Sequence, residues 1–486
     1  MLGMVTGMLA GLYLSPFLIR HLGASGYGLW VLIGSVVGYF GFTDLGVRGS
    51  TSRLVAFYSA RNESLRLNQT INTSLLLLGA SAVGVTILTI LFAPLFAKLF
   101  HIDPSVPNVA STVFVCGLTV AISLPLNVFE GFLSGFERYT VLNFVDIAGT
   151  AGRVALTVWL LQRGMGILAM GLINFGLVLA AGLAKCVLVA RTFPAFRIKW
   201  AYVDRAISKE VASYGIWFFI LGVSTTIIFL TDNLVVGYFI GTSAVAVYSI
   251  AARLAQYARS GVLAFNWVLT PVAATYDAKG DLVRQQRLLI QGTRASLAYA
   301  IFMTAIFLTY GGAIIRSWVG PGFEQGAVVL ALLTLPSAAS ITQMTTSSVL
   351  QGMAKHKSLA LILLAEALAN LALSLLLVRP LGIYGVALGT TLTTTISGLV
   401  AQPILACRTI SMPLGRYYST AFLPIIMGSL PLIVPIVAVG YFWQPARFVE
   451  AAAFCLVAAL LYFAGAYGLF FSRNALLAPR LGFQPR

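Results

Sequence analysis

The sequence predicts an all-α integral membrane protein of about fourteen transmembrane helices, and its composition and its apolar runs are the observations that predict it. Of 486 residues, 59% are apolar and 9% are charged, whereas a soluble domain carries about 25% charged residues. The apolar runs have the length of membrane spans. Helices are expected because a backbone in lipid must satisfy its own hydrogen bonds. The alternating segments of about ten residues that are typical of barrel strands are not found.

Polar breaks divide the apolar runs into fourteen candidate spans. We expect them near residues 1–19, 27–47, 71–97, 109–129, 141–161, 167–190, 213–240, 244–270, 293–315, 326–350, 359–378, 385–406, 419–440 and 450–471. The C-terminal tail and the breaks after the even-numbered spans hold 21 Lys and Arg residues, if Arg294 at the edge of the 293–315 span is counted with them. The other breaks hold six. Because basic residues concentrate on the cytoplasmic side, both termini are predicted to be cytoplasmic.

An internal repeat with an offset of about 218 residues runs through these spans. The matched stretches are LVAFYSARNE at 54–63 with VAATYDAKGD at 272–281, HLGASG at 21–26 with FIGTSA at 239–244, GFER at 135–138 with GMAK at 352–355, and GMGILAMG at 164–171 with GIYGVALG at 382–389. Each repeat contains six spans, an even number, so the two copies have the same orientation in the membrane. Parallel repeats of this kind are typical of transporters whose substrate binds between the halves.

The repeat predicts the domain organisation. We expect an N-lobe at 1–190, a cytoplasmic inter-lobe linker at 191–212, a C-lobe at 213–408, and two further spans with a basic tail at 409–486.

Apart from Arg294 and Glu450 at span edges, eight charged residues lie inside the predicted spans. They are the acids Asp44, Asp146, Asp232 and Glu366 and the bases Arg153, Lys185, Arg253 and Arg259. A charge at the bilayer centre costs about 2.5–3.5 kcal/mol, so it normally faces a partner or a wet cavity. Asp44 and Asp232 lie near span ends, where pairing with local backbone or Arg is an equally good explanation. Lys185 lies near a cytoplasmic end and could extend to the interface.

The 244–270 span carries a polar stripe. Ser249, Arg253, Gln256 and Ser260 recur at i, i+4, i+7 and i+11 on an otherwise apolar helix, and Arg259 lies about a third of a turn away. A cavity wall is the favoured interpretation, and a buried salt bridge to Asp232 or Asp146 is the alternative. At the repeat offset Arg253 corresponds to Ser35 and Arg153 to Asn370 or Leu371. The repeat therefore preserves the fold without preserving the charges.

Arginines in a cavity suit an anionic ligand because the guanidinium group binds phosphate bidentately. The predicted substrate-binding residues are Arg153, Arg253, Gln256, Arg259 and Lys185. The predicted ion-coupling residues are Asp232, Glu366, Asp44 and Asp146, with H⁺ or Na⁺ as the coupling ion and nothing to select between them. No other cofactor and no metal are expected.

Several function classes are excluded by missing motifs. There is no GxxxxGK[ST] phosphate loop and no HExxH metal motif, so an ATP motor and a metalloenzyme are not predicted. The excess of basic residues does not predict nucleic acid binding, because the Lys and Arg residues are spread between apolar runs and form no patch. The four cysteines show no CxxC spacing.

The stretch from Pro16 to Arg61 resembles the opening of polysaccharide-transport proteins, on the pieces RHLG at 20–23, YGLW at 27–30, DLG at 44–46 and RLVA at 53–56. The segments TDNLVVGYFIG at 231–241 and VYSIAAR at 247–253 resemble the same group. It belongs to the multidrug/oligosaccharidyl-lipid/polysaccharide exporter superfamily, which includes the O-antigen-unit flippases. The resemblance covers nearly the whole chain.

The resemblance implies a flippase that moves a polyprenyl-pyrophosphate-linked oligosaccharide unit across the bacterial inner membrane by alternating access, for surface polysaccharide assembly. It implies a lipid-linked oligosaccharide substrate, contact with membrane lipids, and a polysaccharide polymerase and chain-length machinery as candidate partners. Two alternatives remain open. One is a multidrug/cation antiporter of the same fold, and the other is a non-transporting membrane scaffold of a glycan synthesis complex.

Overall fold

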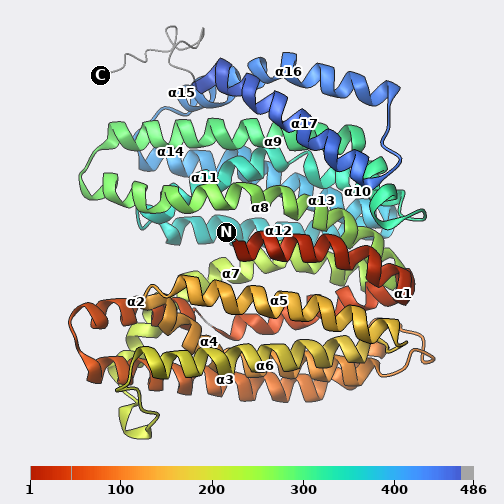
Figure 1. The fold of residues 1–486 in the computed structure, drawn as a ribbon. Helices are drawn as coiled ribbons and strands as arrows, with labels where there is room; N and C mark the ends of the chain where they lie inside the picture. Colours follow the sequence, from red (N-terminus) through yellow and green to blue (C-terminus); the bar gives the residue numbers. More distant parts are fainter. Residues whose placement is uncertain (1, 45, 472–486) are drawn as a thin grey trace. The chain divides into compact units, whose positions relative to one another are not determined.

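The computed structural model describes residues 2–44 and 46–471, and these residues form helices joined by short connections (Figure 1). The predicted basic tail from 472 onward lies outside the described residues. The chain divides into two compact units, Met1–Ala246 and Val247–Arg486. This division lies after the predicted linker at 191–212. The predicted lobe boundaries therefore do not coincide with it and stay a prediction.

The first unit contains six long helices and one shorter one. They are α1 (Leu2–Phe40), α2 (Val47–Ala60), α3 (Ser64–Leu99), α4 (Val109–Gly135), α5 (Tyr139–Gln162), α6 (Ile167–Thr192) and α7 (Arg205–Phe239), with short 3₁₀ turns at Gly41–Asp44 and Trp200–Tyr202. A break at Gly23, with φ 71° and ψ 173°, divides α1. Only glycine adopts this conformation at little cost.

The helix that follows, α8 (Thr242–Ala278), begins in the first unit and continues into the second. The second unit then contains α9 (Leu282–Val319), α10 (Gln325–Thr334), α11 (Ser337–Gly352), α12 (His356–Leu381), α13 (Ile383–Ile396), α14 (Gln402–Thr409), α15 (Leu414–Tyr417), α16 (Leu423–Phe442) and α17 (Phe448–Ala466). Three π-helical turns, Ser397–Ala401, Tyr418–Phe422 and Tyr467–Phe471, extend α13, α15 and α17.

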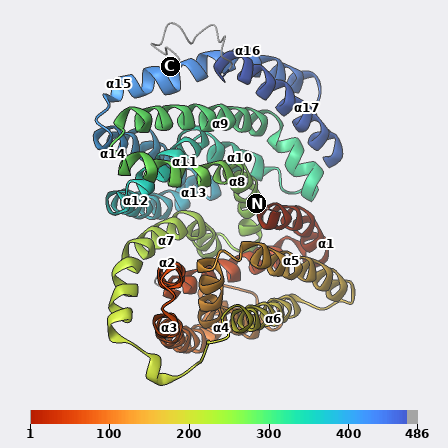
Figure 2. The ribbon, with the colours of Figure 1, turned by 60° about the vertical axis from the view of Figure 1, so that its left-hand side comes forward.

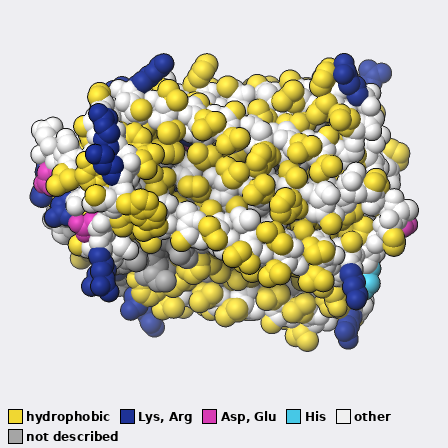
Figure 3. Space-filling model, turned by 90° about the horizontal axis from the view of Figure 1, so that it is seen from below, with side chains coloured by type: hydrophobic (Ala, Val, Ile, Leu, Met, Phe, Trp, Pro, Cys, Tyr) yellow, Lys and Arg dark blue, Asp and Glu magenta, His cyan; other side chains and the backbone are white. Residues whose placement is uncertain are grey.

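The predicted all-α membrane fold is confirmed. Eleven helical segments in the described part of the chain are long and apolar enough to span a membrane, and the pair α10–α11, bent by 41°, makes twelve. The count of fourteen remains a prediction, because Leu2–Ala60 counts as one segment despite its break and the 37-residue α8 is not among the eleven. On the face in Figure 3, apolar side chains form a broad band, and Lys and Arg gather at its two ends.

Helix boundaries recur along the chain at the repeat offset. Ser64 and Leu282, which begin α3 and α9, are 218 residues apart. Tyr139 and His356, which begin α5 and α12, are 217 apart. A tandem repeat of one helical unit predicts this recurrence.

The same close contact recurs in each copy of the repeat. A Cβ on Gly135 of α4 would lie 2.6 Å from the Ser52 carbonyl oxygen of α2, and a Cβ on Gly352 of α11 would lie 2.5 Å from the Thr270 carbonyl oxygen of α8. The two glycines are 217 residues apart and the two carbonyls 218. Small residues let helices in lipid approach this closely, which is the main source of their packing energy.

The segment between α6 and α7 is held against the start of α3, and it projects at the lower edge of the view in Figure 2. The Asn68 amide donates to Ser64 O (3.1 Å) and Ala195 O (3.0 Å) and accepts from Arg197 N (2.8 Å). The Asn72 amide donates to Asn68 O (2.8 Å) and Arg197 O (2.9 Å) and accepts from Lys199 N (2.9 Å). The side-chain amides of Asn68 and Asn72 thus both donate to and accept from the extended backbone between α6 and α7.

We predict that Asn72→Ala destabilises the first unit. The change leaves the Arg197 carbonyl and the Lys199 amide without their side-chain partner, and orphaned groups of this kind cost about 1–3 kcal/mol. The expected fall in Tm is roughly 2–10 °C, measured by fluorescence-monitored unfolding of the purified protein. The control is Gln69→Ala on the same turn, where only a surface contact with Arg66 is lost. An equal fall in Tm for both variants would contradict the prediction.

Candidate functional site

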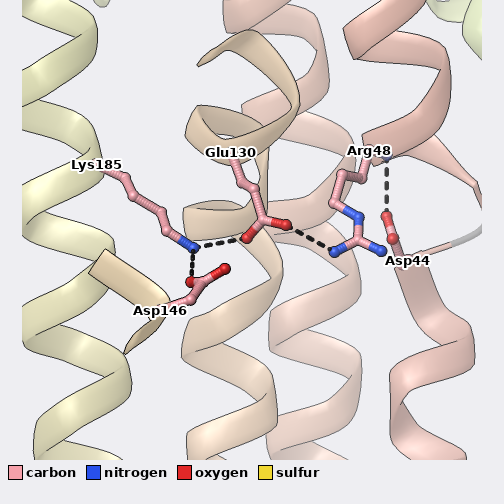
Figure 4. A network of polar contacts seen from close by, with 5 residues as sticks. All are labelled: Asp44, Arg48, Glu130, Asp146 and Lys185. Carbon is pink, nitrogen blue, oxygen red and sulfur yellow. Dashed lines mark hydrogen bonds and ion pairs between the residues drawn. The ribbon is translucent and has the colours of Figure 1, made fainter. Parts of the chain in front are cut away.

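A network of five charged residues connects four helices and one 3₁₀ turn of the first unit (Figure 4). Glu130 of α4 lies at its centre and accepts from Arg48 Nη1 of α2 at 3.1 Å and from Lys185 Nζ of α6 at 2.7 Å. Lys185 Nζ also lies 3.2 Å from Asp146 Oδ1 of α5. Asp44 accepts from the Arg48 backbone N–H at 3.2 Å.

Close packing of α2 on α4 positions the centre of this network. Gly131 follows Glu130, and a Cβ there would lie 2.8 Å from the Arg48 carbonyl oxygen. Gly131 and Gly135 form a small-xxx-small pair on one face of α4, which lets the backbone of α2 approach. Arg48 is therefore within reach of Glu130 because neither glycine carries a side chain.

The network contains three of the predicted site residues, Asp44, Asp146 and Lys185. Lys185 is 8% exposed and contacts two carboxylates, so it does not extend to the interface. Asp44 contacts local backbone at the start of α2, as the simpler explanation for this residue expected. Their predicted roles in substrate binding and ion coupling remain predictions.

A pocket of about 330 Å³ lies beside the network between α4, α5 and α6. Asp146, Gly149, Thr150 and Arg153 line it from α5 at i, i+3, i+4 and i+7. Lys185 lines it from α6, and Ser123 and Asn127 line it from α4. The lining has two cations and one carboxylate, which leaves one net positive charge.

Arg153 differs from the other cation of the pocket. Among the residues that the structure describes, none forms a hydrogen bond or ion pair with Arg153, whereas Lys185 has two carboxylate partners. Arg153 therefore presents a guanidinium group that is available to an anion. This geometry suits the predicted role of Arg153.

The second unit brings together Glu366, Arg259 and Gln256. Arg259 donates to Gln256 Oε1 through Nε (3.2 Å) and Nη2 (2.7 Å). Glu366 of α12 is 8% exposed, lies beside the hydroxyls of Thr394 and Ser397, and is close enough to Arg259 for electrostatic attraction. Ser397 begins a π-helical turn, a geometry that is frequent at functional sites.

The other predicted residues lie on the expected helices. The polar stripe from Ser249 to Ser260 lies on α8, where Ser249 and Ser260 are buried and Arg253 is half-buried. Asp232 of α7 is 4% exposed. Its neighbours contact α1, since Thr231 hydrogen-bonds to Tyr39 and Asn233 donates to Ser35 Oγ at 3.0 Å.

A larger pocket of about 500 Å³ lies elsewhere in the first unit, between the 100–106 loop and the end of α7. His101 and Asp103 line it, and none of the predicted site residues does. Hydrogen bonds from Ser105 hold the pKa of Asp103 below its usual value. This pocket lacks the concentration of charge that marks the one beside Arg153.

The sequence analysis missed Glu130 and Arg48. Both lie just outside the predicted spans, Glu130 one residue after 109–129 and Arg48 one residue after 27–47. A signal was available, because Glu130 directly precedes the Gly131–Gly135 pair that predicts close contact with another helix. Its partners on α2 and α6 are distant in sequence, so only the fold brings them together.

The membrane-length apolar helices of the described residues define a multi-pass membrane protein. The family model described as "Polysaccharide biosynthesis protein" matches residues 1–276, more than half of the chain. The chain belongs to this family.

Two curated relatives are similar over most of the chain. "Uncharacterized membrane protein EpsK" of Bacillus subtilis (strain 168) is 22% identical over 434 residues, which covers 87% of this chain and 83% of the relative. A Shigella flexneri protein described as "Putative O-antigen transporter" is 22% identical over 400 residues, which covers 79% of this chain and 91% of the relative.

Solved structures share the fold. The lipid II flippase MurJ in an inward closed conformation superposes with a TM-score of 0.74 at 15% identity, covering 96% of this chain and 97% of that one. A multidrug resistance MATE family transporter of the MOP superfamily, in its inward-facing conformation, gives a TM-score of 0.68 at 17% identity, covering 83% and 98%. At these identities the likeness shows the fold alone.

We predict that the two cations of the pocket differ in their contribution to stability. Lys185→Met leaves Glu130 and Asp146 without their shared counter-ion, so the free energy of unfolding should fall by an amount between the ~1 kcal/mol of an exposed pair and the ~3 kcal/mol of a buried one. Arg153→Met should change it by less than about 0.5 kcal/mol. Thermal unfolding of the purified variants measures both. A larger loss for Arg153→Met would show that its guanidinium has a structural partner.

Proposed function

We propose that this protein is a flippase that moves a polyprenyl-pyrophosphate-linked oligosaccharide unit across the bacterial inner membrane by alternating access, for surface polysaccharide assembly. Membership of the polysaccharide biosynthesis family supports the substrate class. The fold shared with a lipid II flippase supports the reaction type. Cytoplasmic termini and association with a polysaccharide polymerase and chain-length machinery are part of this proposal.

The observation that carries the proposal is the guanidinium of Arg153 in a pocket with a net positive charge. A planar guanidinium binds two phosphate oxygens at once, and its interaction is strong where water is scarce. A pocket for cationic drugs would need the opposite charge. The pocket chemistry therefore favours an anionic head group over the antiporter alternative.

The size of the pocket limits what it can hold. At about 330 Å³ it lies at the lower end of small-molecule pockets, which range from about 300 to 1,000 Å³. It can admit the diphosphate end of a lipid-linked sugar but not a whole oligosaccharide. In the proposed function it is a subsite for the charged end of the substrate.

We predict that translocation depends on Arg153. In a deletion strain, Arg153→Ala should reduce surface polysaccharide at least about tenfold, because a charge-assisted hydrogen bond contributes about 1.5–3 kcal/mol, and lipid-linked units should accumulate inside the cell. Arg153→Lys should retain part of the activity if charge alone matters and none if the planar group matters. Immunoblots of the surface glycan and extraction of lipid-linked sugars provide the two readouts.

The matched control is Arg163→Ala, directly after the C-terminal end of α5, where the guanidinium stacks on Trp159 outside the pocket. Normal surface glycan with Arg153→Ala at wild-type expression would contradict the phosphate role. Unchanged glycan with raised drug sensitivity in the deletion strain would favour the antiporter. Full activity of a charge-reversed pair at Asp146 and Lys185, with Arg153→Ala also active, would favour a scaffold.

We further propose that Glu366 couples transport to H⁺ or Na⁺. It is a buried carboxylate beside hydroxyl groups and a cation in the second unit. Glu366→Gln should abolish the dependence of uptake on an ion gradient in proteoliposomes, since the amide neither ionises nor carries a charge. Separate H⁺ and Na⁺ gradients identify the ion. Glu324→Gln, in a loop, is the control, and a full gradient response in Glu366→Gln would refute the assignment.

A further inference from the structure

The segment that joins α6 to α7 exposes apolar side chains outside the membrane-spanning helices. Ile198 is 65% exposed and Trp200 is 79% exposed. Exposed apolar residues on a span are explained by lipid contact, but these two lie in the connection between α6 and α7, Ile198 in extended backbone and Trp200 at the start of a 3₁₀ turn. We call Arg197, Ile198, Lys199 and Trp200 the linker patch.

The backbone of the linker patch is rigidly held. The amides of Asn68 and Asn72 bind it at Ala195, Arg197 and Lys199, as described above. Beyond the patch, the backbone N–H of Asp204 donates to Thr73 Oγ1 at 3.0 Å. The backbone of the patch is therefore fixed, and its side chains are exposed.

The basic side chains around the linker patch are exposed, whereas the acidic side chains contact the protein. Five basic residues lie between 191 and 209, and all are exposed: Arg191, Arg197, Lys199, Arg205 and Lys209. The two acids of this region face the protein. Asp204 caps α7 and lies 3.5 Å from Arg66, and Glu210 accepts from the Tyr58 hydroxyl at 3.4 Å. The outward surface is thus positive.

The position of the patch along α3 places it at a membrane boundary. It lies beside Asn68 and Asn72, in the polar first turns of a helix whose continuous apolar run begins with Leu75. The two helices that flank it in sequence, α6 and α7, both contain membrane-length apolar segments. Trp and basic residues together at such a boundary are typical of the headgroup region of a bilayer.

We propose that the linker patch binds anionic lipid headgroups and inserts Ile198 and Trp200 among them. Arg197 and Lys199 supply attraction to phosphate, worth about 1 kcal/mol for each basic residue near the surface. Ile198 and Trp200 remove apolar area from water. A lipid surface is favoured over a protein partner because cationic and apolar residues alternate along a short segment between two helices that both contain membrane-length apolar segments. This anchor is independent of the transported substrate.

The first test is fluorescence quenching of the full chain in proteoliposomes. The contribution of Trp200 is the difference in emission between the wild type and Trp200→Phe. Phosphatidylglycerol brominated near the headgroup end of its chains should quench this contribution, and aqueous iodide should not. Quenching by iodide but not by brominated lipid would place Trp200 in water and overturn the proposal.

The second test measures headgroup selectivity. Brominated phosphatidylglycerol is titrated into phosphatidylcholine vesicles until half of the Trp200 emission is quenched. Arg197→Gln combined with Lys199→Gln should raise the half-quenching fraction by roughly thirty-fold or to beyond the accessible range. The matched control, Lys279→Gln with Arg287→Gln in the α8–α9 region, should leave it unchanged.

Two outcomes would overturn the assignment in different ways. Equal quenching by brominated phosphatidylcholine and phosphatidylglycerol would show insertion without a preference for anionic headgroups. Shielding of Trp200 from iodide in native membranes, with full access in proteoliposomes of either lipid, would show that a protein covers the patch. The Arg197 guanidinium donates to Pro194 O (3.0 Å) and Phe196 O (2.8 Å), so Lys199→Gln alone, which removes no such side-chain contact with the backbone, guards against misfolding of the double variant.

Discussion

Charge neutralisation within the first unit is the constraint on which its candidate site depends. Arg48, Lys185 and Glu130 come from three helices, and Lys185, which is buried, would be costly among apolar side chains without a carboxylate partner. One carboxylate, Glu130, satisfies both cations and thereby fixes α2 and α6 to α4. Asp146 adds α5 through the same lysine. The walls of the Arg153 pocket are therefore held in place by ion pairs, one of which, Lys185–Asp146, is part of the pocket lining.

The repeat separates packing from chemistry. The close contact of Gly135 with α2 recurs at Gly352 with α8, because both copies need the same helix approach. The residues that give each copy its charge do not recur. Helices α5 and α12 begin 217 residues apart, yet the position of Arg153 on one corresponds to Asn370 or Leu371 on the other, and Glu366 corresponds to Ala148 or Gly149. Each unit carries a polar cluster on the equivalent helix, with different charges.

Sequence alone predicts the helices and the repeat because these depend on local composition and on matches in register. It also identifies Arg153 and Glu366 as candidate site residues, since a charged residue within an apolar run can be recognised whichever way its side chain points. It does not predict the Glu130 network, whose members meet only after α2, α4 and α6 have packed. Asn68 and Asn72 illustrate the same limit. Their spacing of four residues places them on one face of a helix, but their backbone partners lie about 125 residues away.

The charge balance of the site gives a physical reason why anion movement should be coupled to a cation. The pocket lining alone carries one net positive charge, but Asp44, Arg48 and Glu130 of the adjoining network bring the total for the whole region to neutral. A diphosphate that enters this neutral region adds negative charge where the dielectric constant is low, and such charge must be compensated. Asp146 is more exposed than Glu130, with 54% of its side chain accessible against 27%, so it is the nearest carboxylate that a cation can approach. Under the proposed function, binding at Arg153 and neutralisation at Asp146 are two parts of one electrostatic requirement.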